Sequence, residues 1–256
     1  MVVLAIANQK GGVGKTTTTV NVATALAAVG KRVVVIDMDP QGNASTGLGL
    51  MGRERKVGTY QVLLDDLSID QALSPSQIPG LSICPASPDL SGAEIELVNA
   101  DCREYRLRDA LERAGDLADY VLIDCPPALG FLTLNALTAA DGVLIPLQCE
   151  YYALEGLSQL MSTIQRVQKR LNKTLALYGI VLTMHDRRSA LSDQVAEEAI
   201  NHFGNLVFET VIPRNVKVSE APSHGQPVLL YDVRSSGSLA YMKLASEILR
   251  RKGARP

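Results

Sequence analysis

The sequence predicts an α/β protein in which one twisted, mainly parallel sheet carries helices on both faces. Two observations lead to this fold class. Short, continuous apolar runs of strand length alternate with longer amphipathic segments, a pattern typical of parallel strands that are buried on both faces. In addition, a glycine-rich loop follows the first apolar run and precedes a helical segment. Phosphate-binding loops occur in this order of elements, so a single-domain P-loop NTPase fold is expected.

Seven apolar runs have the length of strands. They cover residues 2–7, 33–36, 81–84, 120–123, 143–146, 179–182 and 207–212. The clearest helices cover residues 16–29, which Gly30 follows as a cap, and 153–171, where large apolar residues recur every three or four positions. Residues 52–58 and 74–80 are expected to form loops. Because no repeat or low-complexity linker divides the chain, we expect residues 1–256 to form one domain.

Composition and charge exclude several functional classes. The net charge is −2, so DNA affinity would require basic residues gathered on one face. No apolar run approaches the roughly 18 residues of a membrane span, and no basic leader opens the chain, so a cytoplasmic protein is expected. The cysteines lack C-x-x-C spacing, which predicts free and mostly buried thiols. They are Cys84, Cys102, Cys125 and Cys149.

Residues 10–17 read Lys-Gly-Gly-Val-Gly-Lys-Thr-Thr and should bind the phosphates of a nucleotide. Glycines allow backbone N–H groups to approach phosphate oxygens, and the following helix presents its positive N-terminal end to them. Lys15 is expected to reach the β- and γ-phosphates, and the Thr16 hydroxyl is a candidate ligand for Mg²⁺. The predicted nucleotide-binding residues of the loop are Lys10, Gly11, Gly12, Val13, Gly14, Lys15, Thr16 and Thr17.

Three aspartates follow predicted strands and should lie beside this loop. Asp37 and Asp39 come after the second strand, and Asp124 ends the fourth. Because parallel strands end at a common edge, these carboxylates should meet the phosphate loop there. Asp37 and Asp124 are candidates for holding Mg²⁺ together with Thr16, and Asp39 for orienting the attacking water. Without the loop, the same residues could form a plain turn, a helix cap or a surface ion pair.

One departure from the general P-loop pattern is informative. Gln9 stands where the pattern has glycine, and a second lysine, Lys10, follows it. The run K-G-G-V-G-K-T resembles the deviant phosphate loop of the ParA/Soj, MinD and nitrogenase iron proteins. Two stretches narrow the resemblance to ParA/Soj, D-P-Q-G-N at residues 39–43 and I-P-R-N-V-K-V-S-E-A-P at residues 212–222. It extends over nearly the whole chain, although Y-D-V-R at residues 231–234 departs from the usual Y-D-P-R.

The resemblance implies a Mg²⁺-dependent ATPase that forms an ATP-sandwiched homodimer. In that family, the residue matching Lys10 contacts the partner's phosphates, and the residue matching Asp39 is needed for hydrolysis. Pro213 and Asn215 match positions that lie at the adenine. Residues 126–130 resemble the second switch, and residues 144–156 resemble a segment that helps to form the dimer interface.

The resemblance also implies nonspecific binding of double-stranded DNA by the ATP-bound dimer. Arginines that match Arg188 and Arg214 support this binding in the family, and Lys217 and Arg234 are further candidates. A ParB-like centromere-binding protein would stimulate hydrolysis and release the dimer from DNA. Such a protein segregates a chromosome or plasmid, and it is expected in the cytoplasm on the nucleoid.

Three other functions are compatible with this fold class. A membrane-directed ATPase like MinD would use a C-terminal amphipathic helix, and residues 238–250 carry apolar side chains on one side. Because the chain then ends in Arg-Arg-Lys-Gly-Ala-Arg-Pro, we expect a core-packed helix and no membrane contact. An iron–sulfur ATPase would need cysteines that converge at the dimer axis. A small-molecule ligase or kinase would need a substrate-binding region, and the sequence reveals no separate domain for one.

Overall fold

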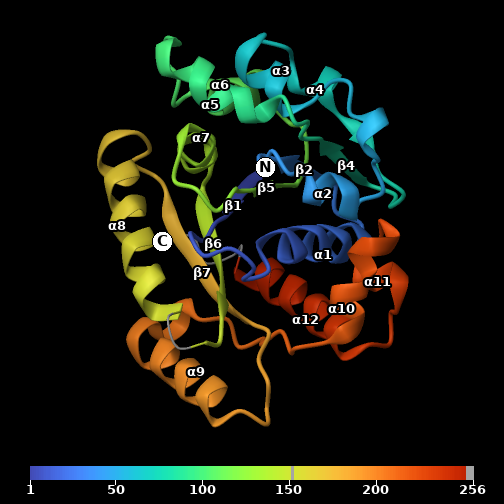
Figure 1. Cartoon of the computed structure of the whole chain (residues 1–256), viewed down its shortest axis with the longest axis vertical. Helices are drawn as coiled ribbons and strands as arrows, with labels where there is room; N and C mark the ends of the chain where they lie inside the picture. The colour runs from blue at the N-terminus through green and yellow to red at the C-terminus, as the bar shows by residue number, and fades with distance from the viewer. Residues whose placement is uncertain (151–152, 252–256) are drawn as a thin grey trace.

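Seven strands form one sheet at the centre of the molecule (Figure 1). The structure is a computed structural model and describes residues 1–150 and 153–251. Along the sheet the strands lie in the order β3-β4-β2-β5-β1-β6-β7. Their bounds are β1 Val2–Ile6, β2 Val33–Asp37, β3 Ser74–Pro75, β4 Leu81–Cys84, β5 Tyr120–Asp124, β6 Gly142–Gln148 and β7 Ala176–Thr183.

The strands run parallel except for β3, which pairs antiparallel with β4. β1, β2 and β5 are buried along their whole lengths, because aliphatic side chains occupy both of their faces. β5 lies between β2 and β1, and its last residue, Asp124, is in register with Asp37 on one side and Ile6 on the other. The ends of three strands therefore meet at one edge, where the phosphate loop leaves β1.

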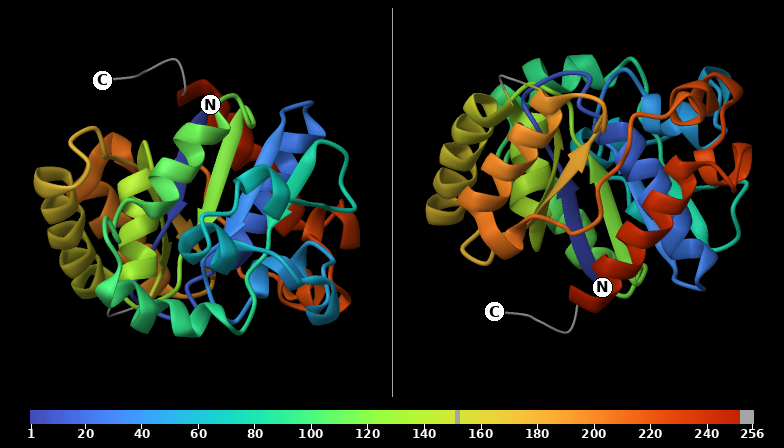
Figure 2. Two further views of the ribbon diagram at one scale, coloured as in Figure 1. Left: turned by 90° about the horizontal axis from the view of Figure 1, so that it is seen from above. Right: turned by 90° about the horizontal axis from the view of Figure 1, so that it is seen from below.

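Helices cover both faces of this sheet (Figures 1 and 2). One face packs mainly against α1, α2, α11 and α12, and the other mainly against α3 and α5–α9. Their bounds are α1 Lys15–Ala28, α2 Asn43–Gly47, α3 Thr59–Leu64, α4 Ile69–Ala72, α5 Leu90–Glu96, α6 Arg106–Ala114, α7 Phe131–Ala139, α8 Ala153–Arg170, α9 Ala190–Phe203, α10 Val216–Glu220, α11 Val228–Tyr231 and α12 Ser236–Arg251. The predicted fold class is confirmed.

The two helices predicted from periodicity are confirmed as α1 and α8, with ends that differ by one residue at most. The apolar side chains of α8 that are buried are Leu157, Leu160, Ile164 and Val167. Leu154, which was expected on the same face, is one of residues 151–155, whose side chains lie outside the described part of the structure. The expected loops are less uniform, since residues 74–80 contain β3 and residues 52–58 contain a 3-10 turn at Gly52–Glu54.

The strand predicted at residues 207–212 does not form. Val207 makes one isolated bridge to Ile180 of β7. The backbone N–H groups of Glu209 and Thr210 donate instead to the Glu247 carboxylate of α12, at 2.9 and 3.1 Å. Phe208 N and Ile212 N still donate to Ile180 O and Leu182 O of β7, both at 2.8 Å, but the Glu247 side chain holds the residues between them out of a regular ladder. The apolar run favours a strand, but this tertiary contact decides its conformation.

The C-terminal helix packs into the core, as expected. α12 lies beside α1 (Figure 2, right), and Leu244 and Ile248 are fully buried there, although Leu239 stays exposed. A membrane anchor would need this apolar face to be free, so the packing argues against the MinD-like alternative as far as Arg251. Across residues 1–150 and 153–251, no helix is both long and apolar enough to cross a bilayer. Residues 252–256 lie outside the described structure.

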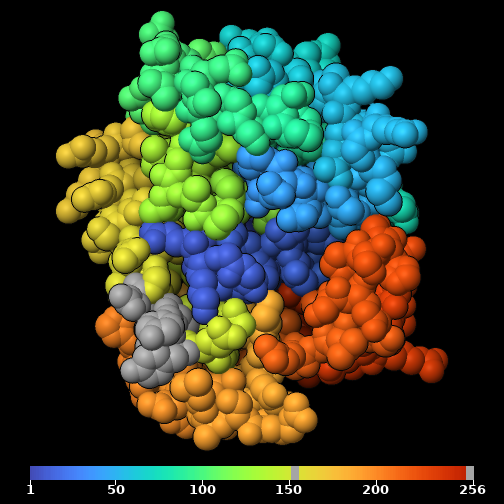
Figure 3. All heavy atoms as spheres, in the orientation of Figure 1, coloured from blue at the N-terminus to red at the C-terminus, as the bar shows by residue number. Residues whose placement is uncertain are grey.

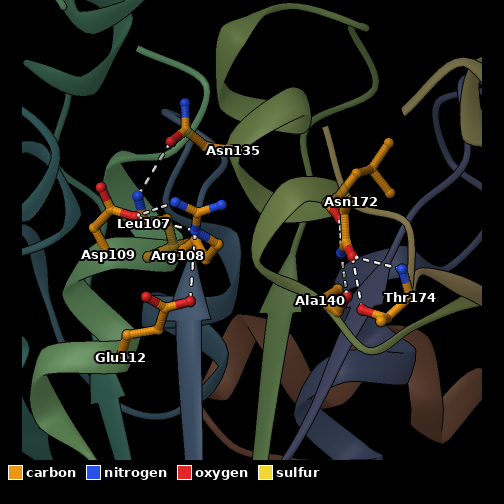
Figure 4. A network of polar contacts seen from close by, with 9 residues as sticks. Leu107, Arg108, Asp109, Glu112, Asn135, Ala140, Asn172 and Thr174 are labelled. Carbon is orange, nitrogen blue, oxygen red and sulfur yellow. Dashed lines mark hydrogen bonds and ion pairs between the residues drawn. The ribbon is translucent and has the colours of Figure 1, made fainter. Parts of the chain in front are cut away.

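Polar side chains tie α7 to α6 along its length and to the loop after α8 at its carboxyl end (Figure 4). Asn135 of α7 accepts a hydrogen bond from Leu107 N at 3.1 Å. The Asn172 amide donates to Ala140 O at 2.7 Å, just beyond the end of α7. Since α7 begins after β5, at the edge that carries the phosphate loop, this network fixes the far end of a helix that starts near the candidate site.

Candidate functional site

The phosphate loop connects β1 to α1, and dark-blue atoms of this amino-terminal segment reach the surface in the middle of the face in Figure 3. Gly12 and Gly14 have φ angles of 75° and 88°, which cost residues with a Cβ about 1 kcal/mol or more. A Cβ on Gly12 would meet no heavy atom within 4 Å, so there is room beside the backbone. The Val13 carbonyl accepts a hydrogen bond from Thr183 Oγ1 of β7 at 2.9 Å, which fixes the loop to the sheet.

Lys15, the first residue of α1, is buried within this loop, with only 7% of its surface exposed. Its ammonium donates to Lys10 O at 3.2 Å. Burial lowers the pKa of Lys15, and the carboxylates of Asp124 and Asp39 oppose that shift. A buried cation under a glycine loop, partly compensated by nearby carboxylates, is well placed to receive phosphate oxygens.

Asp124 at the end of β5 holds the start of α1. Its two carboxylate oxygens accept hydrogen bonds from Thr16 Oγ1 at 2.8 Å and Thr19 Oγ1 at 3.0 Å. Burial, followed by the charge of Asp37, raises the pKa of Asp124 to about 8, although the two hydroxyl donors act against the shift. Because burial of a carboxylate without a cation is unfavourable, this group is prepared to gain a cationic partner.

Asp37 is the second fully buried carboxylate. Its Oδ2 accepts hydrogen bonds from Ser45 N at 2.8 Å and Ser45 Oγ at 2.7 Å, and its Oδ1 accepts one from Asp39 N at 3.2 Å. Burial raises the pKa of Asp37 to about 6, and these donors limit the shift. With Asp124 in register on the next strand, the two predicted magnesium carboxylates are brought together.

Asp39 lies at the rim of this pair and is 9% exposed. Its Oδ1 accepts a hydrogen bond from Gln41 N at 3.0 Å, and its charge acts on both Lys15 and Asp124. The carboxylate is therefore fixed near the phosphate loop and still reaches solvent. A group that accepts a proton or orients a water molecule needs this combination.

The oxygen-rich site fits Mg²⁺ better than a soft metal. Within the described residues, no group of three or more histidine, cysteine, aspartate and glutamate side chains could hold a metal ion. Magnesium commonly takes one or two protein oxygens and completes its shell with phosphate and water. The Thr16 hydroxyl, with Asp124 and Asp37 behind it, offers such a partial set.

Lys10, unlike Lys15, has an exposed side chain that pairs with a surface carboxylate. Its ammonium pairs with Glu150 Oε2 at 3.0 Å, and the two side chains are 37% and 48% exposed. Glu150 also accepts a hydrogen bond from the Gln148 amide at 2.5 Å. Exposed ion pairs of this kind contribute about 0–1 kcal/mol, so Lys10 can be released at little cost. Residues 151–152, in the segment expected at a dimer interface, lie outside the described structure.

Pro213 and Asn215 lie on the segment that runs beside the loop after β7. Pro213 bridges to His185, and the preceding residue, Met184, would contact a Cβ on Gly14 at 3.8 Å. The side-chain Oδ1 of Asn215 accepts a hydrogen bond from Val218 N at 3.3 Å and caps α10. Pro213 and Asn215 therefore lie on a segment that is held to the loop after β7, and that loop in turn lies beside the phosphate loop.

Two of the three principal candidates for DNA contact are paired with carboxylates in the isolated chain. The guanidinium of Arg188, whose side chain is 88% exposed, contacts both oxygens of Asp186 at 3.2 Å. The pKa of Asp186 is lowered mainly by hydrogen bonds from Arg188, and the charge of Arg214 adds to the effect. The Arg214 N–H donates to His185 O at 3.0 Å, and Arg188 follows three residues later in the same loop, so these two exposed arginines lie on neighbouring segments. Lys217 on α10 pairs with Glu220 Oε2 at 3.0 Å, and Arg234 is exposed.

Some side chains that shape the site were not among the predicted residues. Thr19 stands one turn after Thr16 on α1, so helical spacing could have indicated it. Ser45 and Glu150 meet Asp37 and Lys10 only through the fold, and no local signal marks them. Three cysteines are buried and one, Cys102, is exposed, and all four are free.

Comparison with known proteins gives consistent matches along nearly the whole chain. A family model described as an AAA domain matches residues 1–177. The chromosome partitioning protein ParA of Caulobacter vibrioides is 59% identical over 252 residues, covering 98% of this chain and 94% of that protein. The chromosome-partitioning ATPase Soj of Treponema pallidum is 50% identical over 252 residues, covering 98% of each. The structure of cobyrinic acid a,c-diamide synthase from Mycobacterium smegmatis with bound ADP and magnesium has a TM-score of 0.87 at 39% identity, covering 100% of this chain and 97% of that one.

Proposed function

This chain belongs to the ParA and Soj family of chromosome-partitioning ATPases, and we propose that it is an ATP-driven switch that moves DNA. The observation that carries the proposal is the pair of lysines on one phosphate loop. Lys15 is enclosed under the loop, whereas Lys10 is exposed and held only by a surface ion pair. One lysine serves the chain's own nucleotide, and the other is free to serve a second copy.

ATP would bind with its phosphates on the loop from Lys10 to Thr17. The backbone N–H groups and the Lys15 ammonium neutralise phosphate charge. Mg²⁺, held by the Thr16 hydroxyl and through water by Asp37 and Asp124, would supply charge stabilisation at the β- and γ-phosphates. Pro213 and Asn215 would flank the adenine. The diamide synthase that shares this fold was solved with ADP and magnesium, which supports the same ligands here.

Hydrolysis requires a water molecule in line with the γ-phosphate. Asp39 would orient that water, because its carboxylate is fixed at the rim of the site and reaches solvent. Lys10 would leave Glu150 and contact the phosphates bound to the second protomer, which closes a sandwich dimer and adds positive charge as the phosphoryl group leaves. Turnover would be slow without a partner, since a switch must keep its state.

The dimer would bind double-stranded DNA through phosphate contacts. Arg188 and Arg214 lie on neighbouring segments near Asp186, and Lys217 and Arg234 would add to their contacts. A two-fold dimer doubles each contact, so affinity rises steeply although the chain is acidic overall. A ParB-like protein would then stimulate hydrolysis and release the dimer. We therefore place the protein in the cytoplasm, on the nucleoid, with no membrane contact.

A small-molecule ligase is the second candidate, because the diamide synthase matches at 39% identity. The partitioning relatives match at 59% and 50% over equal lengths, so we favour the DNA switch. DNA binding measured with ADP, ATP and a non-hydrolysable ATP analogue tests the choice. We expect tight, sequence-independent binding only with ATP and the analogue. Equal DNA affinity in all nucleotide states would refute the switch, even if ATP hydrolysis is observed.

A further inference from the structure

Arg55 connects the turn after α2 to α2 itself. It follows the 3-10 turn Gly52–Glu54, and its side chain is half-buried. Its Nη2 donates to Thr46 Oγ1 at 2.6 Å and to Leu50 O at 2.7 Å, and its Nε donates to Leu50 O at 3.2 Å. One planar guanidinium therefore holds both α2 and the residues that follow it.

The same guanidinium lies against Gly42, the residue that precedes α2. A Cβ built on Gly42 would collide with Arg55 Nη1, so this position has no room for a side chain while Arg55 is in place. Gly42 has a φ angle of 63°, in the left-handed region that glycine adopts at little cost. Glycine at residue 42 therefore allows the backbone of the D-P-Q-G-N stretch to pack directly on the Arg55 side chain.

A chain of hydrogen bonds leads from Arg55 to the turn that carries Asp39. The Thr46 hydroxyl accepts from Arg55 and donates to Gly42 O at 3.1 Å, and Thr46 N donates to the same carbonyl at 3.0 Å. Gly42 N donates in turn to Asp39 O at 2.8 Å. Because a hydroxyl can accept and donate at the same time, Thr46 connects the guanidinium to the turn at residues 39–42.

Arg55 also interacts with the buried Asp37. Burial lowers the pKa of Arg55, and the charge of Asp37, followed by that of Glu54, opposes this shift. The guanidinium stays charged nevertheless, because the pKa of arginine is far above neutral in proteins. Arg55 is therefore a permanent cation beside the segment that carries Asp37 and Asp39, in addition to the lysines of the phosphate loop.

We propose that Arg55 is a positioning residue for ATP hydrolysis, which acts through Thr46 and Gly42 to hold the Asp39 carboxylate where it orients the attacking water. The inference rests on the proposed function, in which Asp39 has that role. A misplacement of about 1 Å at such a group can cost roughly a hundredfold in rate. Because Thr46 and Leu50 engage the guanidinium, Arg55 should affect the rate of hydrolysis and leave ATP binding to the phosphate loop unchanged.

The test uses variants of the full chain that remove single parts of this link. Thr46→Val removes the hydroxyl and keeps the branched shape of the side chain, whereas Thr46→Ser keeps the hydroxyl. Arg55→Lys keeps the charge but cannot donate as a planar fork. Arg53→Ala is the matched control, because Arg53 is an exposed arginine of the adjoining 3-10 turn. The readouts are the basal kcat and the KM for ATP.

We expect Thr46→Val and Arg55→Lys each to lower kcat by about tenfold or more, with the KM for ATP within about twofold of the wild type. Thr46→Ser and Arg53→Ala should keep the wild-type kcat. The double variant Thr46→Val, Arg55→Lys should be no slower than the slower single variant, because both changes break the same link. Independent structural effects would multiply instead.

A wild-type kcat in both Thr46→Val and Arg55→Lys would overturn the positioning role and leave the proposed function intact. Equal losses in Thr46→Ser and Thr46→Val would also overturn it, because the effect would not depend on the hydroxyl. So would a higher KM for ATP at wild-type kcat, or losses that multiply in the double variant. Asp39→Ala is measured alongside, and normal hydrolysis in that variant would refute the role of Asp39 in the proposed function, and this inference with it.

Discussion

The pair of buried aspartates predicts an unusual pH dependence of stability, and Asp124→Asn isolates it. In the metal-free chain, burial and the neighbouring Asp37 raise the pKa of Asp124 to about 8, whereas an unfolded aspartate titrates near 3.9. At pH 6 the native chain therefore holds a proton that the unfolded chain has lost. The proton on Asp124 stabilises the native chain. This stabilisation is fully present below about pH 4, and it is lost as the pH rises from there through about 8.

The magnitude follows from proton linkage. One extra proton on the native chain changes the free energy of unfolding by about 1.4 kcal/mol per pH unit. Between pH 6 and pH 8, the free energy of unfolding of the wild type should therefore fall by about 2 kcal/mol because Asp124 loses its proton. Asp124→Asn cannot titrate, so the variant should lose about 2 kcal/mol less than the wild type over that interval. The absolute stability of the variant is not the measured quantity, because the amide also changes the bonds to Thr16 and Thr19.

The assay is urea unfolding at pH 6, 7 and 8 in EDTA without nucleotide. Asp65→Asn is the control, because Asp65 is exposed on the surface, and its pH dependence should follow the wild type. Adding Mg²⁺ and ADP should flatten the wild-type curve, since a cation at the site favours the ionised carboxylate. Parallel curves for the wild type and Asp124→Asn would refute the coupling between these carboxylates and the metal site.

Four further predictions concern the nucleotide and DNA sites. Lys15→Ala should abolish ATP binding in calorimetry, because each lost charged contact to phosphate contributes roughly 1.5–3 kcal/mol; unchanged affinity would refute the P-loop assignment. Asp39→Ala should bind ATP and dimerise but not hydrolyse, so that DNA-bound dimer accumulates in a filter or gel assay; normal phosphate release would remove Asp39 from the mechanism. Lys10→Ala should bind ATP as a monomer in sedimentation with a non-hydrolysable analogue, and a stable, active dimer would contradict the sandwich. Arg214→Ala and Arg188→Ala should each flatten the log–log salt dependence of DNA binding by about 2, since each removes two phosphate contacts per dimer. The loss of affinity should be larger for Arg214, because Arg188 must first leave Asp186, and equal affinity in both variants and the wild type would exclude this surface.

Most of the site could be predicted because its residues are adjacent in sequence to the elements that position them. Lys15 and Thr16 start the helix that follows a glycine loop, and Asp37 and Asp124 end buried strands. In a parallel sheet those ends share one edge, but the order β2-β5-β1, which makes them neighbours along that edge, comes from the fold. The strand at residues 207–212 was predicted wrongly for the converse reason, since its conformation depends on Glu247, far away in sequence.

The same distinction explains why Glu94 carries no signal in the sequence. It stands in an unremarkable Ala-Glu-Ile-Glu run, and its partners Phe131 and Leu132 lie 37 and 38 residues further on. A helix cap normally comes from the residue just before the helix, but Gly130 occupies that position and has no side chain to offer. The cap must therefore come from another element. As a result, the start of α7 depends on α5, and so does the end of the segment that follows Asp124.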